Sequence, residues 1–452
     1  MWVFEILASF LGAVMPPVLI LAGVYFAVRL RGFFILHPVG TARLMSRRRG
    51  DGISPVRAAS MALAGTLGVG NITGVVSAIA AGGAGAVFWM WVSAFAAMSV
   101  KYAETALAVT YRRRSGDGYY GGAPYYIADG MKTRRARGLG AVFAVLCIGN
   151  AFTVGGVLQV NAAARSTSEL LGVSPYAVGG VLAILTLCAV TGGAERITNV
   201  TVWMIPAVSA VYIFMCISVI VICRDALPDA AAAIFRDAFS LRAAGGGAGG
   251  YMITQAIRYG VTRGVITNEA GAGTSPTAHA CADAVSPESQ GCLGIFEVFA
   301  DTILICTLTA LAVLTAGISM TGDAMADATQ VFESVLGDGS GAALSLCVFV
   351  FVLATLFSQH YYARVALRFL GLDLRGSIIF TAAFMCMIIL GSGMAPPVVW
   401  LSADITVGAM TLINVFCLWK MRRMVNAPEM DAAKKSVAGN DAGRTECAPS
   451  RG

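Results

Sequence analysis

The fold of this chain is decided by two glycine-rich stretches, AGTLGVGNITG from Ala64 to Gly74 and GVTRGVITNEAGAGTSP from Gly260 to Pro276. Each interrupts an apolar segment long enough to cross a membrane. Glycine in a helix interior costs about 1 kcal/mol relative to alanine, so both stretches favour unwound backbone. Such backbone at bilayer depth is tolerated only where it is buried in protein or lines a watery cavity. Interrupted helices at corresponding places in two halves of a membrane chain are typical of a secondary transporter.

The composition indicates a membrane protein. Hydrophobic residues make up 57% and charged residues 13% of the chain, whereas a soluble domain has about 25% charged residues. The mean hydropathy is +0.74. A membrane span needs about 20 mostly apolar residues. The sequence therefore predicts an all-α polytopic protein with about eleven transmembrane helices, over residues 5–28, 59–82, 86–111, 139–164, 175–193, 197–223, 250–279, 291–317, 341–363, 376–394 and 397–419.

The distribution of basic residues predicts the orientation in the cell (inner, plasma) membrane. If these spans alternate, 25 of the 32 Lys and Arg residues fall on one side, and basic loops stay in the cytoplasm. The N-terminus is then outside and the C-terminus cytoplasmic. The positive charge thus indicates topology in lipid, and we expect no nucleic-acid partner. Residues 1–424 form the predicted transporter domain, and the polar segment 425–452 is a predicted disordered cytoplasmic tail.

The two breaks divide the chain into halves. Without the first span, ten remain, and the breaks fall in the first and sixth of these. This pattern predicts an inverted repeat of five helices, over about 57–223 and about 250–420. Because each repeat has an odd number of spans, the second lies inverted in the membrane.

A broken helix exposes carbonyl groups where its first half ends and N–H groups where its second half begins. The carbonyls suit a cation and the N–H groups suit a carboxylate, so a zwitterionic amino acid matches such a pocket. Close packing of helices through small residues is the alternative, but Asn and Thr in both breaks favour a ligand site. The candidate substrate-binding residues in the breaks are Thr66, Gly68, Gly70, Asn71, Thr267, Asn268 and Gly271.

Ionisable residues within spans are functional candidates. Arg263 and Asp404 lie in the outer halves of their spans, where they could form an outer gate or a structural pair. Lys101 and Glu104 are three residues apart near a cytoplasmic helix end. For these two, the sequence predicts mutual pairing and side chains that extend to the membrane surface.

Several long motifs resemble the alanine or glycine:cation symporter family. They include ALAGTLGVGNITGV from Ala62, GGAPYYI from Gly121, TRGVITNEAGAGTSPTAHA from Thr262 and QGCLGIFEVFADTILICTLTAL from Gln290. The resemblance implies a leucine-transporter-like fold of two inverted five-helix repeats with an extra N-terminal helix, and inward transport of small amino acids with sodium. It also places Gln159 and Asn161, in GVLQVNAAA, at family positions, and the glutamine faces the substrate there.

One segment departs from the family pattern. Where the eighth core helix usually reads like FSTxLGWSYYGE, this chain has LATLFSQHYYAR from Leu353 to Arg364. Thr355 keeps the family threonine, and together with Gly65 and Thr66 it forms the candidate sodium site. Gln359 replaces the tryptophan that walls the family's small pocket. We therefore expect Gln359 to line a roomier and more polar substrate pocket than that of an alanine carrier.

The sequence thus predicts a sodium-coupled symporter of small amino acids (the alanine and glycine class) that works by alternating access. One alternative is proton-coupled or uncoupled transport of a larger or more polar amino acid. Another is an amino-acid-binding sensor without transport. The sequence contains no nucleophile–base set, metal-ligand spacing or phosphate loop. We therefore expect no enzymatic activity and no cofactor, with the amino acid, sodium ion and membrane lipid as partners.

Overall fold

The structure is a computed structural model that describes residues 2–45, 52–116, 118–239, 248–284, 286–372 and 374–428. The described residues are almost all helical, apart from a short antiparallel pair of strands, β1 (Arg113–Ser115) and β2 (Gly118–Tyr120). Residues 429–452 lie outside the described residues. They hold Cys447 and most of the predicted disordered tail.

The helices of the first half are α1 (Trp2–Arg29), α2 (Phe33–Leu36), α3 (Pro38–Met45), α4 (Pro55–Thr66), α5 (Thr73–Gly82), α6 (Gly85–Thr110), α7 (Ala123–Gly130), α8 (Ala136–Phe152), α9 (Leu158–Leu171), α10 (Pro175–Val190), α11 (Gly193–Ile222) and α12 (Leu227–Phe239). Two 3₁₀ turns, Val69–Asn71 and Arg224–Ala226, accompany them. A π-helical stretch, Thr153–Val157, joins α8 to α9.

The second half contains α13 (Ala248–Asn268), α14 (Pro276–Ala280), α15 (Pro287–Val298), α16 (Thr307–Ala316), α17 (Ala324–Leu336), α18 (Gly339–Phe369), α19 (Leu374–Gly391) and α20 (Pro396–Met421). A second π-helical stretch, Phe299–Cys306, joins α15 to α16, and a 3₁₀ turn, Arg422–Met424, follows α20.

Each predicted span contains helix. Among the described residues, eight helices are long and apolar enough to cross a membrane, or nine if the bent pair α4 and α5 is one span. The remaining two predicted spans are α10, which has 16 residues, and the segment 250–279, which is interrupted after Asn268. The count of eleven and the inverted repeat remain predictions.

The first break lies where it was predicted. Pro55 starts α4, and the Ser54 hydroxyl caps it by accepting from the Arg57 N–H at 3.3 Å, a favourable helix start. The helix ends at Thr66, and α5 continues at an angle of 62° to it. Because Gly68 and Gly70 in the turn between them have little helix preference, the axis can change direction here without straining a long helix.

The second break also occurs within its predicted stretch. Helix α13 ends at Asn268, and Glu269, Gly271 and Gly273 then have φ of +51°, +86° and +75°. The left-handed region is open to glycine but costs about 1–2 kcal/mol for other residues. Glycine therefore permits this turn, and Glu269 is held there by its surroundings.

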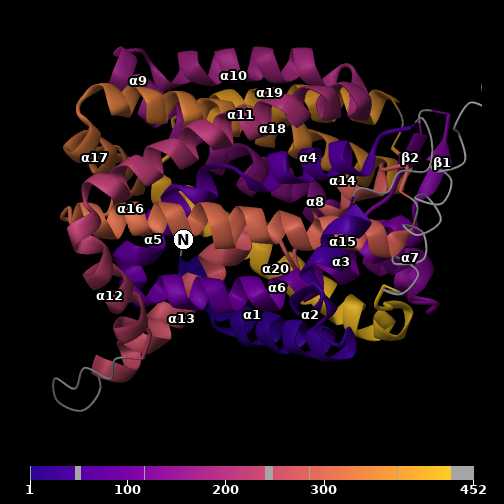
Figure 1. The fold of residues 1–452 in the computed structure, drawn as a ribbon. Coiled ribbons are helices and arrows are strands. Elements are labelled where there is room, and N and C mark those ends of the chain that lie inside the picture. The colour runs from indigo at the N-terminus through magenta and orange to yellow at the C-terminus, as the bar shows by residue number, and fades with distance from the viewer. Residues whose placement is uncertain are drawn as a thin grey trace, which may run out of the picture.

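Helices α6 and α18 pack at the centre of the protein. Helix α6 contacts α1, α13 and α15, while α18 contacts α4, α8 and α9. Figure 1 shows β1, β2 and α7 at one end of the long helices and α12 and α17 at the other. The predicted cytoplasmic loop 112–138 and the predicted outer segments therefore lie at opposite ends. This arrangement places both breaks between the ends, around the centre of the helices.

Candidate functional site

The first break is held by side chains from distant helices. The Gly68 N–H donates to Asn71 Oδ1 at 3.1 Å, and the Val69 N–H donates to Gln159 Oε1 at 3.0 Å. Gln159 lies on α9, directly after the π-helical stretch. Two N–H groups of the break, those of Gly68 and Val69, thus have amide partners, as buried backbone donors require. Gln159 therefore lies at the break, and its predicted contact with the substrate stays a prediction.

The two breaks contact each other. A Cβ built on Gly70 would lie 3.1 Å from the Thr267 methyl carbon, so a larger side chain at Gly70 would push the segments apart. The Thr267 hydroxyl donates to the Gly264 carbonyl at 2.7 Å, and the Ala270 N–H donates to Asn268 Oδ1 at 2.9 Å. Glycine at position 70 therefore permits the close approach of the breaks.

Asp301 joins the breaks, and the sequence analysis missed it. This carboxylate is fully buried in the π-helical stretch Phe299–Cys306. Asn71 Nδ2 donates to its Oδ1 at 2.8 Å, and the Thr302 hydroxyl donates to its Oδ2 at 2.8 Å. Asn268 Nδ2 in turn donates to Thr302 Oγ1 at 3.1 Å. The signal that could have found Asp301 is an acidic residue within an apolar span.

Gln359 contacts a carboxylate that follows the second break. Its Nε2 donates to Glu269 Oε1 at 2.6 Å, and its Oε1 accepts from Asn150 Nδ2 at 3.3 Å. The Thr274 hydroxyl donates to Glu269 Oε2 at 2.5 Å. Gln359 also lies tightly against Gly155, where a Cβ would be 2.4 Å from its Cγ. The carboxamide is thus engaged within the protein, and its predicted role in a substrate pocket stays a prediction.

The predicted sodium ligands come only partly together. The Thr355 hydroxyl lies 3.5 Å from the Leu67 carbonyl and donates to the Phe351 carbonyl at 3.0 Å. The Thr66 hydroxyl instead faces its own helix, 3.3 Å from the Leu63 carbonyl, and Gly65 lies against the Tyr362 hydroxyl. Thr355 is thus next to the end of α4, whose last carbonyls have no partner within the helix.

Arg263 and Asp404 form an ion pair between α13 and α20, with Nη1 and Oδ1 2.6 Å apart. The guanidinium also lies over the Trp400 ring, 4.2 Å from its centroid. A cavity of about 340 Å³ lies beside this pair, and its wall includes Arg263, Trp400, Asn161 and Thr73. The predicted gate residues are therefore paired, while gating itself remains a prediction.

Asn161 does not join Gln159 at the first break. Its Nδ2 donates to the Met394 carbonyl at 2.7 Å and to the Gly391 carbonyl at 3.2 Å, in the connection between α19 and α20. Residues two apart on a helix point in different directions. Asn161 is nevertheless part of the wall of the 340 Å³ cavity.

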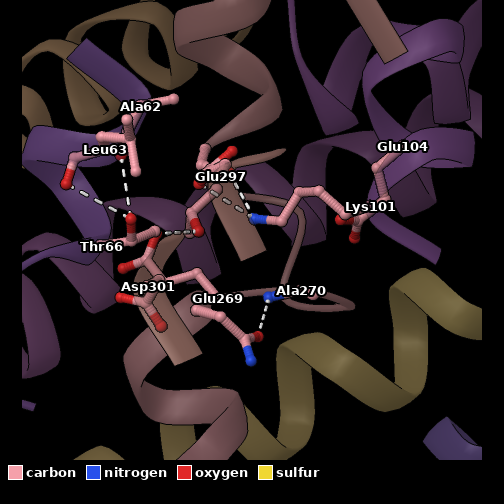
Figure 2. A network of polar contacts seen from close by, with 12 residues as sticks. Ala62, Leu63, Thr66, Lys101, Glu104, Glu269, Ala270, Glu297 and Asp301 are labelled. Carbon is pink, nitrogen blue, oxygen red and sulfur yellow. Dashed lines mark hydrogen bonds and ion pairs between the residues drawn. The ribbon is translucent and has the colours of Figure 1, made fainter. Parts of the chain in front are cut away.

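A second polar network, of Lys101, Ser275 and Glu297, lies on the side of the breaks toward β1 and β2. The prediction for Lys101 was wrong. Lys101 is fully buried and does not extend to the surface. Its Nζ lies 3.3 Å from Glu297 Oε1 on α15 and donates to Ser275 Oγ at 2.5 Å. Figure 2 shows its side chain reaching toward Glu297 rather than Glu104. The reason is that α15 packs along α6 and provides a nearer carboxylate than the helix itself.

Three buried carboxylates, Glu104, Glu269 and Asp301, form no ion pair with the residues that the structure describes. All three contact a break, directly or through one side chain. An isolated charge in a low-dielectric interior is very costly, so such a group is protonated or binds a cation. The centre of this protein is therefore suited to bind positively charged partners.

A sequence profile of the sodium:alanine symporter family matches residues 1–444. The amino-acid carrier protein AlsT of Bacillus subtilis is 31% identical over 94% of this chain and 90% of its own length. The sodium/alanine symporter AgcS of Methanococcus maripaludis is 33% identical over 90% of this chain and 91% of its own. The probable sodium/glutamine symporter GlnT of B. subtilis is 30% identical, over 93% and 87%.

Among solved structures, the manganese transporter of Eremococcus coleocola has a similar fold. The TM-score is 0.51 at 12% sequence identity, over 82% of this chain and 79% of that one. This similarity concerns the fold alone. The profile and the relatives, together with the apolar helices and the broken spans, show that the chain belongs to the sodium:alanine symporter family of transmembrane amino-acid:cation symporters.

Proposed function

We propose that this protein takes up small amino acids of the alanine and glycine class by symport with sodium. The observation that carries the proposal is the contact between the two breaks, joined by the buried Asp301 carboxylate. Backbone N–H groups at a break suit a substrate carboxylate, and the buried carboxylates of Glu269 and Asp301 suit the substrate ammonium and the sodium ion. The names of the relatives AgcS and GlnT support sodium as the coupling ion.

Alternating access agrees with the two sides of the site. The 340 Å³ cavity reaches Thr73 and Asn161 beside the first break. At the other side, the buried cluster of Lys101, Glu297 and His279 joins α6, α14 and α15. In our proposal, the substrate enters through the cavity after Arg263 and Asp404 separate. It leaves when the buried cluster opens.

Transport by the purified protein in proteoliposomes tests this function. With an inward sodium gradient, we expect uptake of labelled alanine that unlabelled glycine inhibits. Competition by serine and glutamine tests the second candidate, a more polar substrate, which the polar Gln359 favours. Uptake that ignores sodium but follows a proton gradient, or binding without uptake, would contradict sodium symport.

The Thr355→Ala variant tests the proposed sodium site. Removal of the hydroxyl takes one oxygen ligand from a hard cation that prefers oxygen ligands. We expect the sodium concentration for half-maximal uptake to rise about tenfold, with a smaller change in maximal rate, because one such contact is worth about 1–1.5 kcal/mol. The exposed Thr191→Ala serves as a control. An unchanged sodium dependence in Thr355→Ala would remove residue 355 from the site.

Cysteine labelling tests the proposed orientation. In a variant whose single cysteine is Cys447, an impermeant thiol reagent should label the protein only after the cells are permeabilised, because the tail is predicted to be cytoplasmic. A matched variant with only Cys223, which is half-buried at the end of α11, should be labelled in intact cells. The reverse pattern would invert the topology.

A further inference from the structure

Glu104 lies at the junction of α6, α7, α20 and the second break. Asn414 on α20 donates through Nδ2 to Glu104 Oε1 and, at 2.8 Å, to the Gly271 carbonyl. The Tyr126 hydroxyl on α7 donates to Asn414 Oδ1 at 2.6 Å. One amide therefore connects the carboxylate to a residue of the break whose φ is +86°.

The second oxygen of the Glu104 carboxylate forms no hydrogen bond with the described residues. Glu104 is fully buried, and Glu104 Oε2 has no hydrogen-bond partner among the described residues. The hydroxyl of Thr411, one helical turn before Asn414, is also fully buried and without a partner there. Thr411 belongs to the same junction, since its methyl carbon would lie 3.2 Å from a Cβ on Gly271. Orphaned polar atoms of this kind cost about 1–3 kcal/mol each.

The basic side chains nearest to Glu104 contact Glu297 instead. His279 lies between Gln290 Nε2, 2.8 Å from its Nδ1, and Glu297 Oε2, 2.9 Å from its Nε2. Lys101 Nζ pairs with Glu297 Oε1 at 3.3 Å, and Glu104 forms no ion pair with the residues that the structure describes.

Among the described residues, no other element packed against α6 forms an ion pair with Glu104. Helix α13 carries Arg258 and Arg263, but Gly260 and Gly264 beside them lie against Ala86 and Ser93, in the opposite half of α6. Cys147 on α8 and Cys417 on α20 lie near Tyr126. The second break contributes Glu269, which is acidic. On α1 the charged residues are confined to the two ends, at Glu5 and Arg29.

Helices α5 and α12 also place no charged side chain near Glu104. Helix α5 carries no charged residue. The charged residues of α12 lie at the other end of α6, where the Trp89 indole donates to the Ala238 carbonyl. That end is about 20 Å from Glu104 at 1.5 Å per residue.

We propose that Glu104 is a proton-binding site, in which Oε2 carries a proton while the second break has the conformation seen here. A metal cation needs several oxygen ligands, but Asn414 already engages Glu104 Oε1 and the Gly271 carbonyl. A proton needs only the one free oxygen. When Gly271 moves, Asn414 is drawn away, water reaches the carboxylate, and the proton passes to that water.

The consequence of this inference for transport rests on the proposed symport. In each transport cycle, Glu104 takes one proton from water on the outer side and releases it on the cytoplasmic side. Glu104 lies in the last two turns of α6, toward the predicted cytoplasmic end. The amino acid and sodium bind elsewhere, at the breaks.

Infrared difference spectroscopy tests the protonation itself. The spectrum of the native protein at neutral pH minus that of Glu104→Gln should contain the C=O stretch of a protonated carboxylic acid. The exposed Glu169→Gln should lose a carboxylate band instead. Because glutamine has the shape of the neutral acid, Glu104→Gln should be as stable as the native protein. A carboxylate band at Glu104, or a marked loss of stability in Glu104→Gln, overturns the proposal.

Proteoliposomes test the link to transport. With a pH-sensitive dye inside, sodium-driven uptake of alanine by the native protein and by Glu169→Gln should acidify the lumen. Glu104→Gln should take up alanine without this acidification, and its uptake should lose the decline that the native protein shows as pH rises. Equal acidification by native protein and Glu104→Gln overturns the proposal. If the native protein transports no amino acid, the proposed symport fails, and the infrared result still decides the proton site.

Discussion

Replacement of Lys101 by methionine is expected to lower the free energy of unfolding by about 3–5 kcal/mol. Methionine keeps the length and the apolar volume of the side chain but removes its charge. The variant leaves the fully buried Glu297 without its cation and Ser275 Oγ without the Nζ donor. A large fall in the midpoint of thermal unfolding in detergent, followed by fluorescence or circular dichroism, would show this effect.

A second substitution separates charge from packing. Glu297→Gln, added to Lys101→Met, removes the uncompensated charge and still gives His279 Nε2 a hydrogen-bond partner, so the double variant should regain much of the lost stability. Lys420→Met, at the exposed end of α20, should melt like the native protein. If Lys101→Met also melts like the native protein, the ion pair of Lys101 and Glu297 does not stabilise the fold.

Asp301→Asn is expected to slow sodium-driven uptake by about 10- to 100-fold, because hydrogen bonds to a charged group are worth about 1.5–3 kcal/mol. The asparagine keeps the size of the side chain but brings an NH₂ group toward two existing donors, Asn71 Nδ2 and the Thr302 hydroxyl. The connection between the two breaks then weakens. Initial rates of labelled alanine uptake in proteoliposomes measure the loss.

A matched control is available in an exposed turn. Asp225 is exposed between α11 and α12, and Asp225→Asn should transport at the native rate. A thermal unfolding midpoint near that of the native protein would show that Asp301→Asn is folded. Native uptake by folded Asp301→Asn would mean that the carboxylate only positions the helices.

The sequence was sufficient to locate the breaks and the helices around them. A glycine's freedom at positive φ and an apolar run of membrane length are properties of short segments, so they can be predicted without knowledge of the neighbours. The bend between α4 and α5, and the left-handed backbone at Gly271, both lie in the stretches quoted first. The family motifs are also short segments, and they can be recognised without knowledge of what packs against them.

The tertiary structure decided which side chains meet. Lys101 pairs with Glu297 instead of Glu104, and Gln359 binds Glu269. Asp301 faces Asn71, which is 230 residues away in the chain. The partner of a buried polar group depends on which helices pack together and on the rotation of each about its axis. The π-helical stretch around Asp301 changes that rotation within α15 and α16, and a regular helical period does not contain this information. The sequence thus determined where the chain unwinds. The packing of the helices determined which polar side chains contact the unwound segments.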